Sequence, residues 1–204
     1  MITVIAGVNG AGKSSVIGSW LRAEGADYFN PDEVAQILHR KDSSISVETA
    51  NISAWQIGFE QLSHAIAVDE DYILETTLGG NSITNKLHEA MEQGRSVRVL
   101  YCGLESVDLH VQRVAERVRR GGHAIPTEKI VERYNSSVAN LLSLIPSLAQ
   151  LVVFDNSAPL VNGTPSPQKL FQLNGKSFET PPSEHLPNWA RPIASVAIKR
   201  ALAD

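Results

Sequence analysis

The chain is poor in cysteine, in long apolar runs and in basic residues. Its single cysteine, Cys102, cannot form an internal disulfide, so we expect a reducing compartment and a buried thiol within an apolar run. No apolar run approaches the roughly 18 residues that a membrane-spanning helix needs, and no signal peptide precedes the first predicted strand. We therefore expect a soluble cytoplasmic protein that has no membrane partner.

The charge balance is slightly acidic, with 18 basic and 22 acidic residues, a net charge of −4 and a pI of about 5.9. Proteins that bind nucleic acid usually carry a basic excess, so nucleic acid is not the partner that we expect. The six histidines show no metal-ligand spacing, and no histidine metal site is predicted. The length of 204 residues fits one α/β domain with a modest extension.

Residues 7–14 read Gly-Val-Asn-Gly-Ala-Gly-Lys-Ser and match every fixed position of the P-loop pattern G-x-x-x-x-G-K-[ST]. Glycines let several backbone N–H groups turn toward one phosphate, and Lys13 can reach the β- and γ-phosphates. The Ser14 hydroxyl can ligate Mg²⁺. We therefore predict nucleotide binding by the loop residues Gly7, Asn9, Gly10, Ala11, Gly12, Lys13, Ser14 and Ser15.

Apolar runs that are typical of strands alternate with helical patterns along the chain. This alternation predicts an α/β fold of the P-loop NTPase class, in which helices flank a mostly parallel sheet. The first strand, the glycine loop and a helix over residues 14–23 follow one another as the motif requires. The predicted strands are residues 2–6, 28–29, 72–74, 97–102 and 151–154.

Apolar residues at helical spacing predict two long helices, over residues 47–68 and 130–148. Trp20 and Trp55 lie in predicted helices and are expected in the core. Seven of the ten prolines follow residue 156, where a hairpin over residues 169–179 and a helix over residues 193–202 are predicted. We therefore divide the chain into a P-loop core, residues 1–155, and a C-terminal extension, residues 156–204, that packs on it within a single domain.

Asp32 follows the second predicted strand in the segment Asn-Pro-Asp-Glu and has two interpretations. It can belong to a helix start, with Asn30 as the cap, Pro31 in the first position and acids that complement the helix dipole. It can also be the base that orients an acceptor hydroxyl toward a γ-phosphate. The residues alone leave both interpretations open.

Glu75 ends the predicted strand 72–74 and precedes two threonines. Such an acid can hold Mg²⁺ or grip the acceptor, and the Thr77 hydroxyl can add a contact; the alternative is a carboxylate that simply faces solvent. The strand and the glycines after it favour the functional interpretation. The predicted metal ligands are therefore Ser14 and Glu75, and the predicted acceptor ligands are Asp32, Glu75 and Thr77.

Arg113, Arg117 and Arg120 form a stripe about 100° around a predicted helix from a stripe of valines. One interpretation is that these arginines bury their alkyl chains along the apolar surface and keep their guanidinium groups in water. Guanidinium groups, however, suit bidentate contact with phosphate, so we predict a lid over the nucleotide. The segment Gly121-Gly122-His123 would be the lid tip, and Arg133 lies one turn inside the next predicted helix.

Together these segments resemble the zeta-toxin family of small P-loop kinases, on residues 7–14, 30–33, 75–77 and 113–134. The resemblance covers about residues 1–155. It implies transfer of the γ-phosphate from ATP, with Mg²⁺, to a sugar hydroxyl, because the well-known members phosphorylate UDP-N-acetylglucosamine. It assigns Asp32 as the base, Lys13 as the phosphate clamp, Glu75 and Thr77 as acceptor ligands, and Arg120 and Arg133 as contacts to the ATP phosphates.

We therefore predict an ATP-dependent kinase of a small-molecule hydroxyl, with Asp32, Lys13 and Arg120 in the catalytic roles. Two rivals stay open: a kinase of nucleic-acid 5′-hydroxyls, and a nucleotide-dependent switch or ATPase without an acceptor. The Leu-Ser-Gly-Gly signature of transporter ATPases, which share this glycine loop, is missing from the sequence. An antitoxin-like protein is a further predicted partner, for which the residues indicate no surface.

Overall fold

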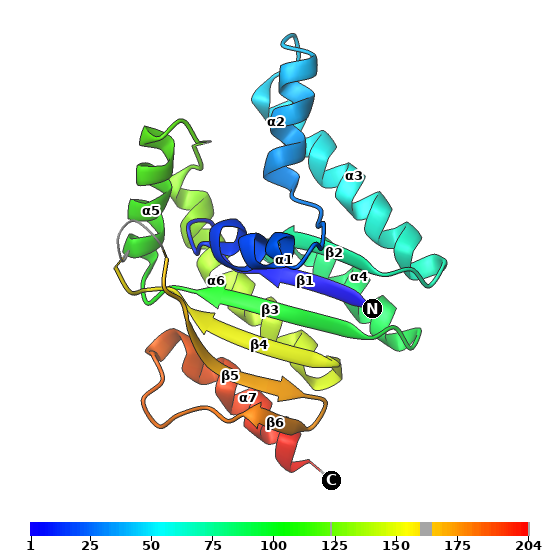
Figure 1. Cartoon of the computed structure of the whole chain (residues 1–204), viewed down its shortest axis with the longest axis vertical. Coiled ribbons are helices and arrows are strands. Elements are labelled where there is room, and N and C mark those ends of the chain that lie inside the picture. Colours follow the sequence, from blue (N-terminus) through cyan, green and yellow to red (C-terminus); the bar gives the residue numbers. More distant parts are fainter. Residues whose placement is uncertain (123, 160–164, 204) are drawn as a thin grey trace.

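The computed structural model describes residues 1–122, 124–159 and 165–203. Its centre is a six-stranded sheet in the order β2-β1-β3-β4-β5-β6 (Figure 1). The first four strands in this order are parallel: β2 (Tyr72–Thr76), β1 (Ile2–Ala6), β3 (Val97–Gly103) and β4 (Gln150–Asp155). The predicted α/β fold with a mostly parallel sheet is therefore confirmed.

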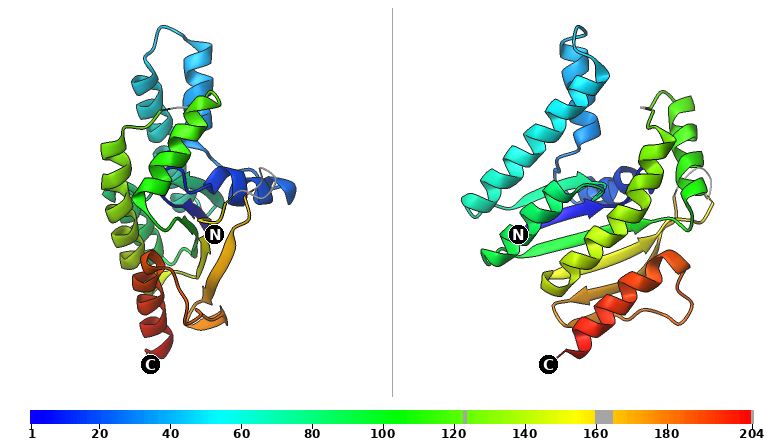
Figure 2. Two further views of the ribbon diagram at one scale, coloured as in Figure 1. Left: turned by 90° about the vertical axis from the view of Figure 1, so that its left-hand side faces the viewer. Right: turned by 180° about the vertical axis from the view of Figure 1, so that it is seen from behind.

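Alternate side chains of these strands enter two separate core clusters, since successive residues of a strand point to opposite faces. Val4, Val99 and Val153 belong to the larger cluster, which includes residues of α3, α4, α6 and α7. Ile5, Leu100 and Val152 belong to the smaller cluster, together with Ile17 and Leu21. Both faces of the sheet are thus covered, as the continuous apolar runs of β1 and β3 require (Figure 2).

Helices connect the parallel strands and cover the sheet. The predicted helices over 47–68 and 193–202 are confirmed, and the one predicted over 130–148 starts earlier, at Thr127, and closes in a 3₁₀ turn. The segment 14–23 begins as a π-helical turn, η1 (Ser14–Gly18). The α-helices are α1 (Ser19–Ala23), α2 (Pro31–Lys41), α3 (Val47–Ala67), α4 (Asn81–Glu92), α5 (Val107–Arg119), α6 (Thr127–Leu144) and α7 (Arg191–Leu202), with 3₁₀ turns at Ile145–Ser147 and Asn188–Ala190.

Two local predictions are wrong. Residues 28–29 form no strand of their own, because Phe29 makes a single parallel bridge with Leu74 before the chain turns into α2. Trp20 and Trp55 are not core residues: they are 55% and 46% exposed, because smaller side chains such as Leu21 and Ala54 occupy the buried positions of their helices.

The residues after 156 join the same sheet and core. The predicted hairpin is present as β5 (Gln168–Asn174) and β6 (Ser177–Thr180), which extend the sheet antiparallel beyond β4. Trp189 packs against Gly103 at the end of β3, and its ring lies 6.1 Å from that of Tyr101. The extension therefore supports the strand end from which the site described below is built.

Two helical hairpins stand out from the sheet, the first beyond the edge strand β2 and the second beside the carboxyl ends of the parallel strands (Figure 1). One consists of α2 and the first half of α3, and the other of α5 and the start of α6. The start of α2 lies beside the carboxyl end of β2, so both hairpins reach the strand ends, where ligands of open α/β sheets bind. Within the described ranges, no helix is long and apolar enough to cross a membrane.

Candidate active site

The glycine loop connects β1 to η1 at the carboxyl edge of the sheet. Gly7, Gly10 and Gly12 have φ of +141°, +86° and +92°, values that L side chains rarely adopt. Their neighbours also leave no room: a Cβ at Gly10 would lie 2.7 Å from the His110 carbonyl oxygen, and one at Gly12 would meet the Asn156 amide. The glycines therefore let the loop lie against β3, α5 and residue 156 while its backbone curls.

Gly7→Ala tests this close packing. An added Cβ would overlap the carbonyl oxygen of Cys102 on the neighbouring strand. The pairing of β1 with β3 holds both backbones in place. We expect the free energy of unfolding, measured by urea denaturation, to fall by about 3 kcal/mol or more. Gly94→Ala is the matched control, because Gly94 has φ +82° and open space around an added Cβ. It should cost only about 1 kcal/mol; equal losses in the two variants would contradict the packing argument.

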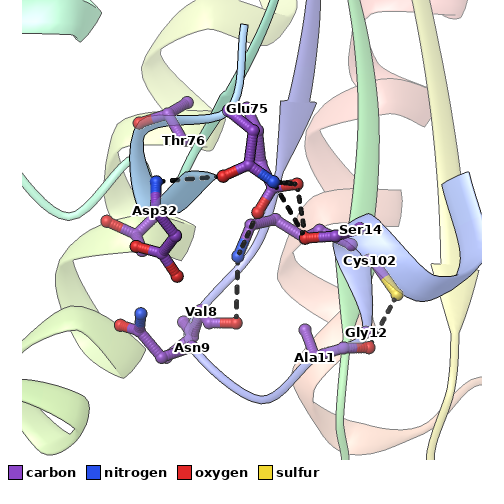
Figure 3. A network of polar contacts seen from close by, with 12 residues as sticks. Val8, Asn9, Ala11, Gly12, Ser14, Asp32, Glu75, Thr76 and Cys102 are labelled. Atoms are coloured by element: carbon purple, nitrogen blue, oxygen red, sulfur yellow. Dashed lines mark hydrogen bonds and ion pairs between the residues drawn. The ribbon is translucent and has the colours of Figure 1, made fainter. Parts of the chain in front are cut away.

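Lys13, Ser14 and Glu75 form a polar group behind the loop, in which Lys13 and Glu75 are buried and Ser14 is half-buried. Figure 3 shows Ser14 and Glu75 turned toward each other. The Ser14 hydroxyl donates to Glu75 Oε2 at 2.8 Å, and Lys13 Nζ lies 3.7 Å from Glu75 Oε1. Lys13 Nζ also points at the Val8 carbonyl oxygen, 3.5 Å away. Asn30 Nδ2 joins the group at 3.4 Å from Ser14 Oγ and 3.5 Å from Glu75 Oε2.

Glu75 is the second residue from the end of β2 and is 8% exposed, so it is not the solvent-facing acid of the alternative interpretation. Burial raises the pKa of Glu75, an effect that Lys13 and the hydrogen bond from Ser14 partly offset. The Ser14 hydroxyl and the Glu75 carboxylate are hard oxygen ligands beside a phosphate loop. Such a pair suits Mg²⁺, which takes its other ligands from phosphates and water.

Asp32 lies in the first turn of α2, and Asn30 is the cap residue of this helix. Asn30 Oδ1 accepts from the backbone N–H groups of Asp32 and Glu33. The cap role thus falls to Asn30, and the carboxylate of Asp32 is left to point into the site. Asp32 Oδ2 accepts from Arg117 Nη1 at 3.3 Å, and both side chains are 38% exposed. This ion pair joins the two projecting hairpins across the strand ends.

A first cleft of about 560 Å³ opens over the glycine loop. It brings together most of the residues that the sequence predicted as ligands: Asn9, Gly10, Gly12, Lys13, Ser14, Ser15, Asp32, Glu75, Thr77, Arg113, Arg117 and Arg120. Gly7 and Ala11 do not line it, because they are buried beneath the loop and shape its backbone.

The three arginines of the predicted lid lie on α5 and at its C-terminal end. Arg113 donates to the Ala158 carbonyl oxygen at 3.0 Å, Arg117 pairs with Asp32, and Arg120 is the C-terminal cap residue of α5. All three side chains line the first cleft beside Gly121 and Gly122. His123, named above as part of the lid tip, lies outside the described residues.

Arg133 does not line the first cleft but a second one, on the other side of Asp32 and Glu75. Its Nη1 donates to Asn9 Oδ1 at 2.8 Å, and a Cβ at Gly79 would meet its side chain at 2.6 Å. Arg133 is therefore held between the glycine loop and the segment that follows β2, at the border of the phosphate site.

Asn156 and His110 are site residues that the sequence reasoning missed. Asn156 is 1% exposed, lines the first cleft and donates from Nδ2 to the Ala11 carbonyl oxygen at 2.9 Å. His110 is also 1% exposed, and its Nδ1 lies 2.8 Å from the Asn9 carbonyl oxygen, so this nitrogen carries a proton. The position of Asn156 directly after β4 was the signal for it, because ligands gather at strand ends; His110 carries no comparable signal.

His110 makes stability depend on pH. Burial lowers the pKa of His110 to about 4, with Lys13 and Arg113 acting in the same direction. The unfolded chain, with an ordinary histidine pKa near 6.5, then binds more protons between pH 6.5 and 4, so stability falls as the pH falls through this range. Between pH 6.5 and pH 4, we expect the free energy of unfolding to fall by roughly 3 kcal/mol less in His110→Gln than in the parent. Urea denaturation at both values measures this; parallel losses in parent and variant would contradict it.

The second cleft has a volume of about 660 Å³ and lies between α3 and the start of α6. It shares six lining residues with the first cleft: Asn9, Pro31, Asp32, Glu75, Thr76 and Thr77. The rest of its wall is mainly apolar. Thr77 Oγ1 accepts from the Gly79 backbone N–H at 3.3 Å, which holds the turn after β2 at the border of the two clefts.

A family model described as an AAA domain (AAA_33) matches residues 2–141. A protein of Haemophilus influenzae, named only as an uncharacterized protein, is 30% identical over 133 residues, which are 63% of this chain and 88% of that protein. The range that the family model matches contains the glycine loop, Asp32, Glu75 and the arginines of α5, and it ends before Asn156.

Solved structures of other proteins have a similar fold. The crystal structure of AvrRxo1-ORF1:-ORF2 with ATP has a TM-score of 0.63 and 14% identity, over 97% of this chain and 63% of that chain. The present chain thus spans less than two thirds of that protein. A structure of the PezAT chromosomal toxin–antitoxin system of Streptococcus pneumoniae has a TM-score of 0.53 and 14% identity, over 76% of this chain and 66% of that chain.

Proposed function

This chain belongs to the AAA-domain family, and from that premise we propose that it is a kinase that transfers the γ-phosphate of ATP to a hydroxyl group of a small molecule. The observation that carries the proposal is the position of Asp32 at the border of two clefts. One cleft is built on a phosphate-binding loop, and the other has room for a second small molecule. An ATPase without an acceptor has no need of the second cleft.

ATP is proposed for the first cleft because the cleft offers a P-loop, Lys13 and three arginines to a triphosphate. The similar crystal structure of AvrRxo1-ORF1:-ORF2 is a complex with ATP, which supports the same ligand here. Mg²⁺ would be held by Ser14 and Glu75, and when bound it would neutralise charge on the phosphates.

The transfer would begin with the acceptor hydroxyl hydrogen-bonded to Asp32. As the acceptor oxygen forms its bond to the γ-phosphorus, the bond from that phosphorus to the bridging oxygen of ADP breaks, and Asp32 takes the hydroxyl proton. Lys13, Arg117 and Arg120 would stabilise the charge on the transferred group and on the leaving ADP. For this, Arg117 must exchange its contact with Asp32 for one with phosphate, which the cleft that both line permits.

The test is transfer of ³²P from γ-labelled ATP to a panel of acceptors with Mg²⁺ present. The panel holds free sugars, aryl glycosides, nucleotide sugars including UDP-N-acetylglucosamine, and oligonucleotides with a 5′-hydroxyl. Label on a small molecule is the expected result. Label on an oligonucleotide, with salt-sensitive binding, would replace the proposal with the nucleic-acid kinase. ATP hydrolysis without any labelled acceptor would favour the switch or ATPase.

Two finer questions are the kind of acceptor and the presence of a partner protein. A nucleotide sugar as acceptor is what the family resemblance of the motifs implies, whereas the lining of the second cleft supports an acceptor without phosphate. An antitoxin-like partner protein rests on that resemblance and on the similar fold in PezAT, which is a toxin–antitoxin system. Growth of a host that expresses the chain without a partner would count against toxicity.

A further inference from the structure

We propose that the second cleft selects an acceptor that carries a flat aromatic ring and no phosphate group, with the ring against Trp55 and a hydroxyl at Asp32. This inference rests on the proposed kinase function, because it assigns the acceptor of that reaction. It goes further by naming the chemistry that the cleft recognises. Three features of the cleft support it: apolar side chains exposed along α3, a held aromatic pair, and a charge balance opposite to that of the first cleft.

The wall that α3 contributes is apolar but largely uncovered. Val47, Ile52 and Trp55 line the cleft while they remain 44%, 59% and 46% exposed. They lie on one side of the helix, together with Phe59. Apolar surface of this extent gains about 25 cal/mol for each Å² that a ligand removes from water. Exposed apolar grooves of this kind mark binding sites.

Trp55 and Phe59 form a stacked pair whose ring centroids lie 5.4 Å apart, with 20° between the planes. Lys86 Nζ lies 5.8 Å from the centroid of the Phe59 ring. On the same helix, Gly58 has no side chain, and Phe29 therefore packs against the helix backbone at the base of the cleft. The aromatic surface is thus held in place before any ligand binds, which suits a flat ring.

The charges of the two clefts differ in sign, for the described lining residues. The first cleft has four cationic side chains, Lys13, Arg113, Arg117 and Arg120, against three acidic ones, Asp32, Glu75 and Glu116. The second has two cationic side chains, Lys129 and Arg133, against three acidic ones, Asp32, Glu48 and Glu75. Phosphate on an acceptor would therefore face a net negative wall.

Both cations of the second cleft are already engaged. Lys129 Nζ lies 2.9 Å from Glu132 Oε2, and Arg133 donates to Asn9 Oδ1. A phosphate would have to share Lys129 with the Glu132 carboxylate and Arg133 with Asn9, whereas an uncharged ring gains from the apolar wall without competing for either cation. The volume of about 660 Å³ lies within the range of small-ligand sites, and Asp32 at its border places one hydroxyl next to the phosphate cleft.

The experiment compares three probes at equilibrium: glucose, 4-nitrophenyl β-glucoside and UDP-glucose. The first adds no ring, the second adds a ring without charge, and the third adds a ring with two phosphates. Calorimetric titration is done with Mg²⁺ and saturating adenylyl imidodiphosphate, which occupies the first cleft. Binding of that nucleotide is measured beforehand. If it fails to bind, the proposed function is wrong, and the probes are then compared without it.

We expect the nitrophenyl glucoside to bind at least about tenfold tighter than both glucose and UDP-glucose. Trp55→Ala should remove this preference. Trp20→Ala is the matched control, because Trp20 is a similarly exposed tryptophan that does not line the second cleft. Circular dichroism establishes that both variants are folded.

Four results would overturn the inference. Tightest binding of UDP-glucose would show that the cleft recognises phosphate. Equal binding of the three probes, or a preference that survives Trp55→Ala, would show that the aromatic surface takes no part. A change in molecular mass on sedimentation in Trp55→Ala, with probe binding unaltered, would mean that a second copy of the chain covers α3.

Discussion

Asp32→Asn is expected to lower the rate of phosphate transfer by about 10²–10⁴-fold, while the affinity for ATP changes by less than about threefold. The amide keeps the size of the side chain and can still accept from Arg117, but it cannot take a proton from an acceptor hydroxyl. Because the helix cap is Asn30, the substitution leaves the start of α2 intact. Transfer is measured with γ-labelled ATP, and binding by calorimetry with adenylyl imidodiphosphate.

Glu33→Gln is the matched control for this variant. Glu33 lies in the same first turn of α2 and has the same effect on the helix dipole, but it lines neither cleft and pairs with Arg22 at the surface. Its transfer rate should stay within about threefold of the parent, since exposed ion pairs contribute little. Asp32→Asn with most of its activity retained would remove Asp32 from the role of base, and the interpretation of Asp32 as a helix-start acid would then stand.

Lys13→Met is expected to weaken ATP binding by about 100-fold and to lower transfer by at least as much. The thioether keeps most of the volume of the side chain, so the loss reports the ammonium group. The group matters in two ways, because it faces the phosphate site and also lies 3.7 Å from the buried carboxylate of Glu75. Without it, the pKa of Glu75 should rise further, and a protonated Glu75 is a poor ligand for Mg²⁺.

Lys41→Met is the control for Lys13→Met, since Lys41 is an exposed cation at the end of α2 that lines neither cleft. It should bind ATP as the parent does. Unchanged ATP binding in Lys13→Met, with circular dichroism like that of the parent, would remove Lys13 from the phosphate site. A second measurement separates the two roles of the lysine. Raising the pH should partly restore the affinity of Lys13→Met for Mg²⁺, because Glu75 loses its proton again.

Local sequence was enough for much of the fold and for the centre of the site. Parallel strands are buried on both faces and therefore consist mostly of apolar residues. The strands β1, β3 and β4 could be recognised in the sequence for this reason. The glycine loop is equally local, since its conformation depends on Gly7, Gly10 and Gly12 themselves. The exposure of Trp20 and Trp55 escaped prediction because their helices also carry smaller apolar residues, and these occupy the buried positions instead.

The sequence by itself determined the class of the protein: a strand, a phosphate loop and a helix, with Asp32 and Glu75 near element ends and three arginines along one helix stripe. Only the tertiary structure decided how these residues meet. Arg117 reaches Asp32 across 85 residues of chain, and Asn156 reaches the loop across 145, contacts that no local pattern encodes. The second cleft likewise exists only because α3 and the start of α6, which are far apart in the chain, line the same space. Phosphate binding is a property of one backbone segment, whereas the choice of acceptor belongs to surfaces that folding brings together.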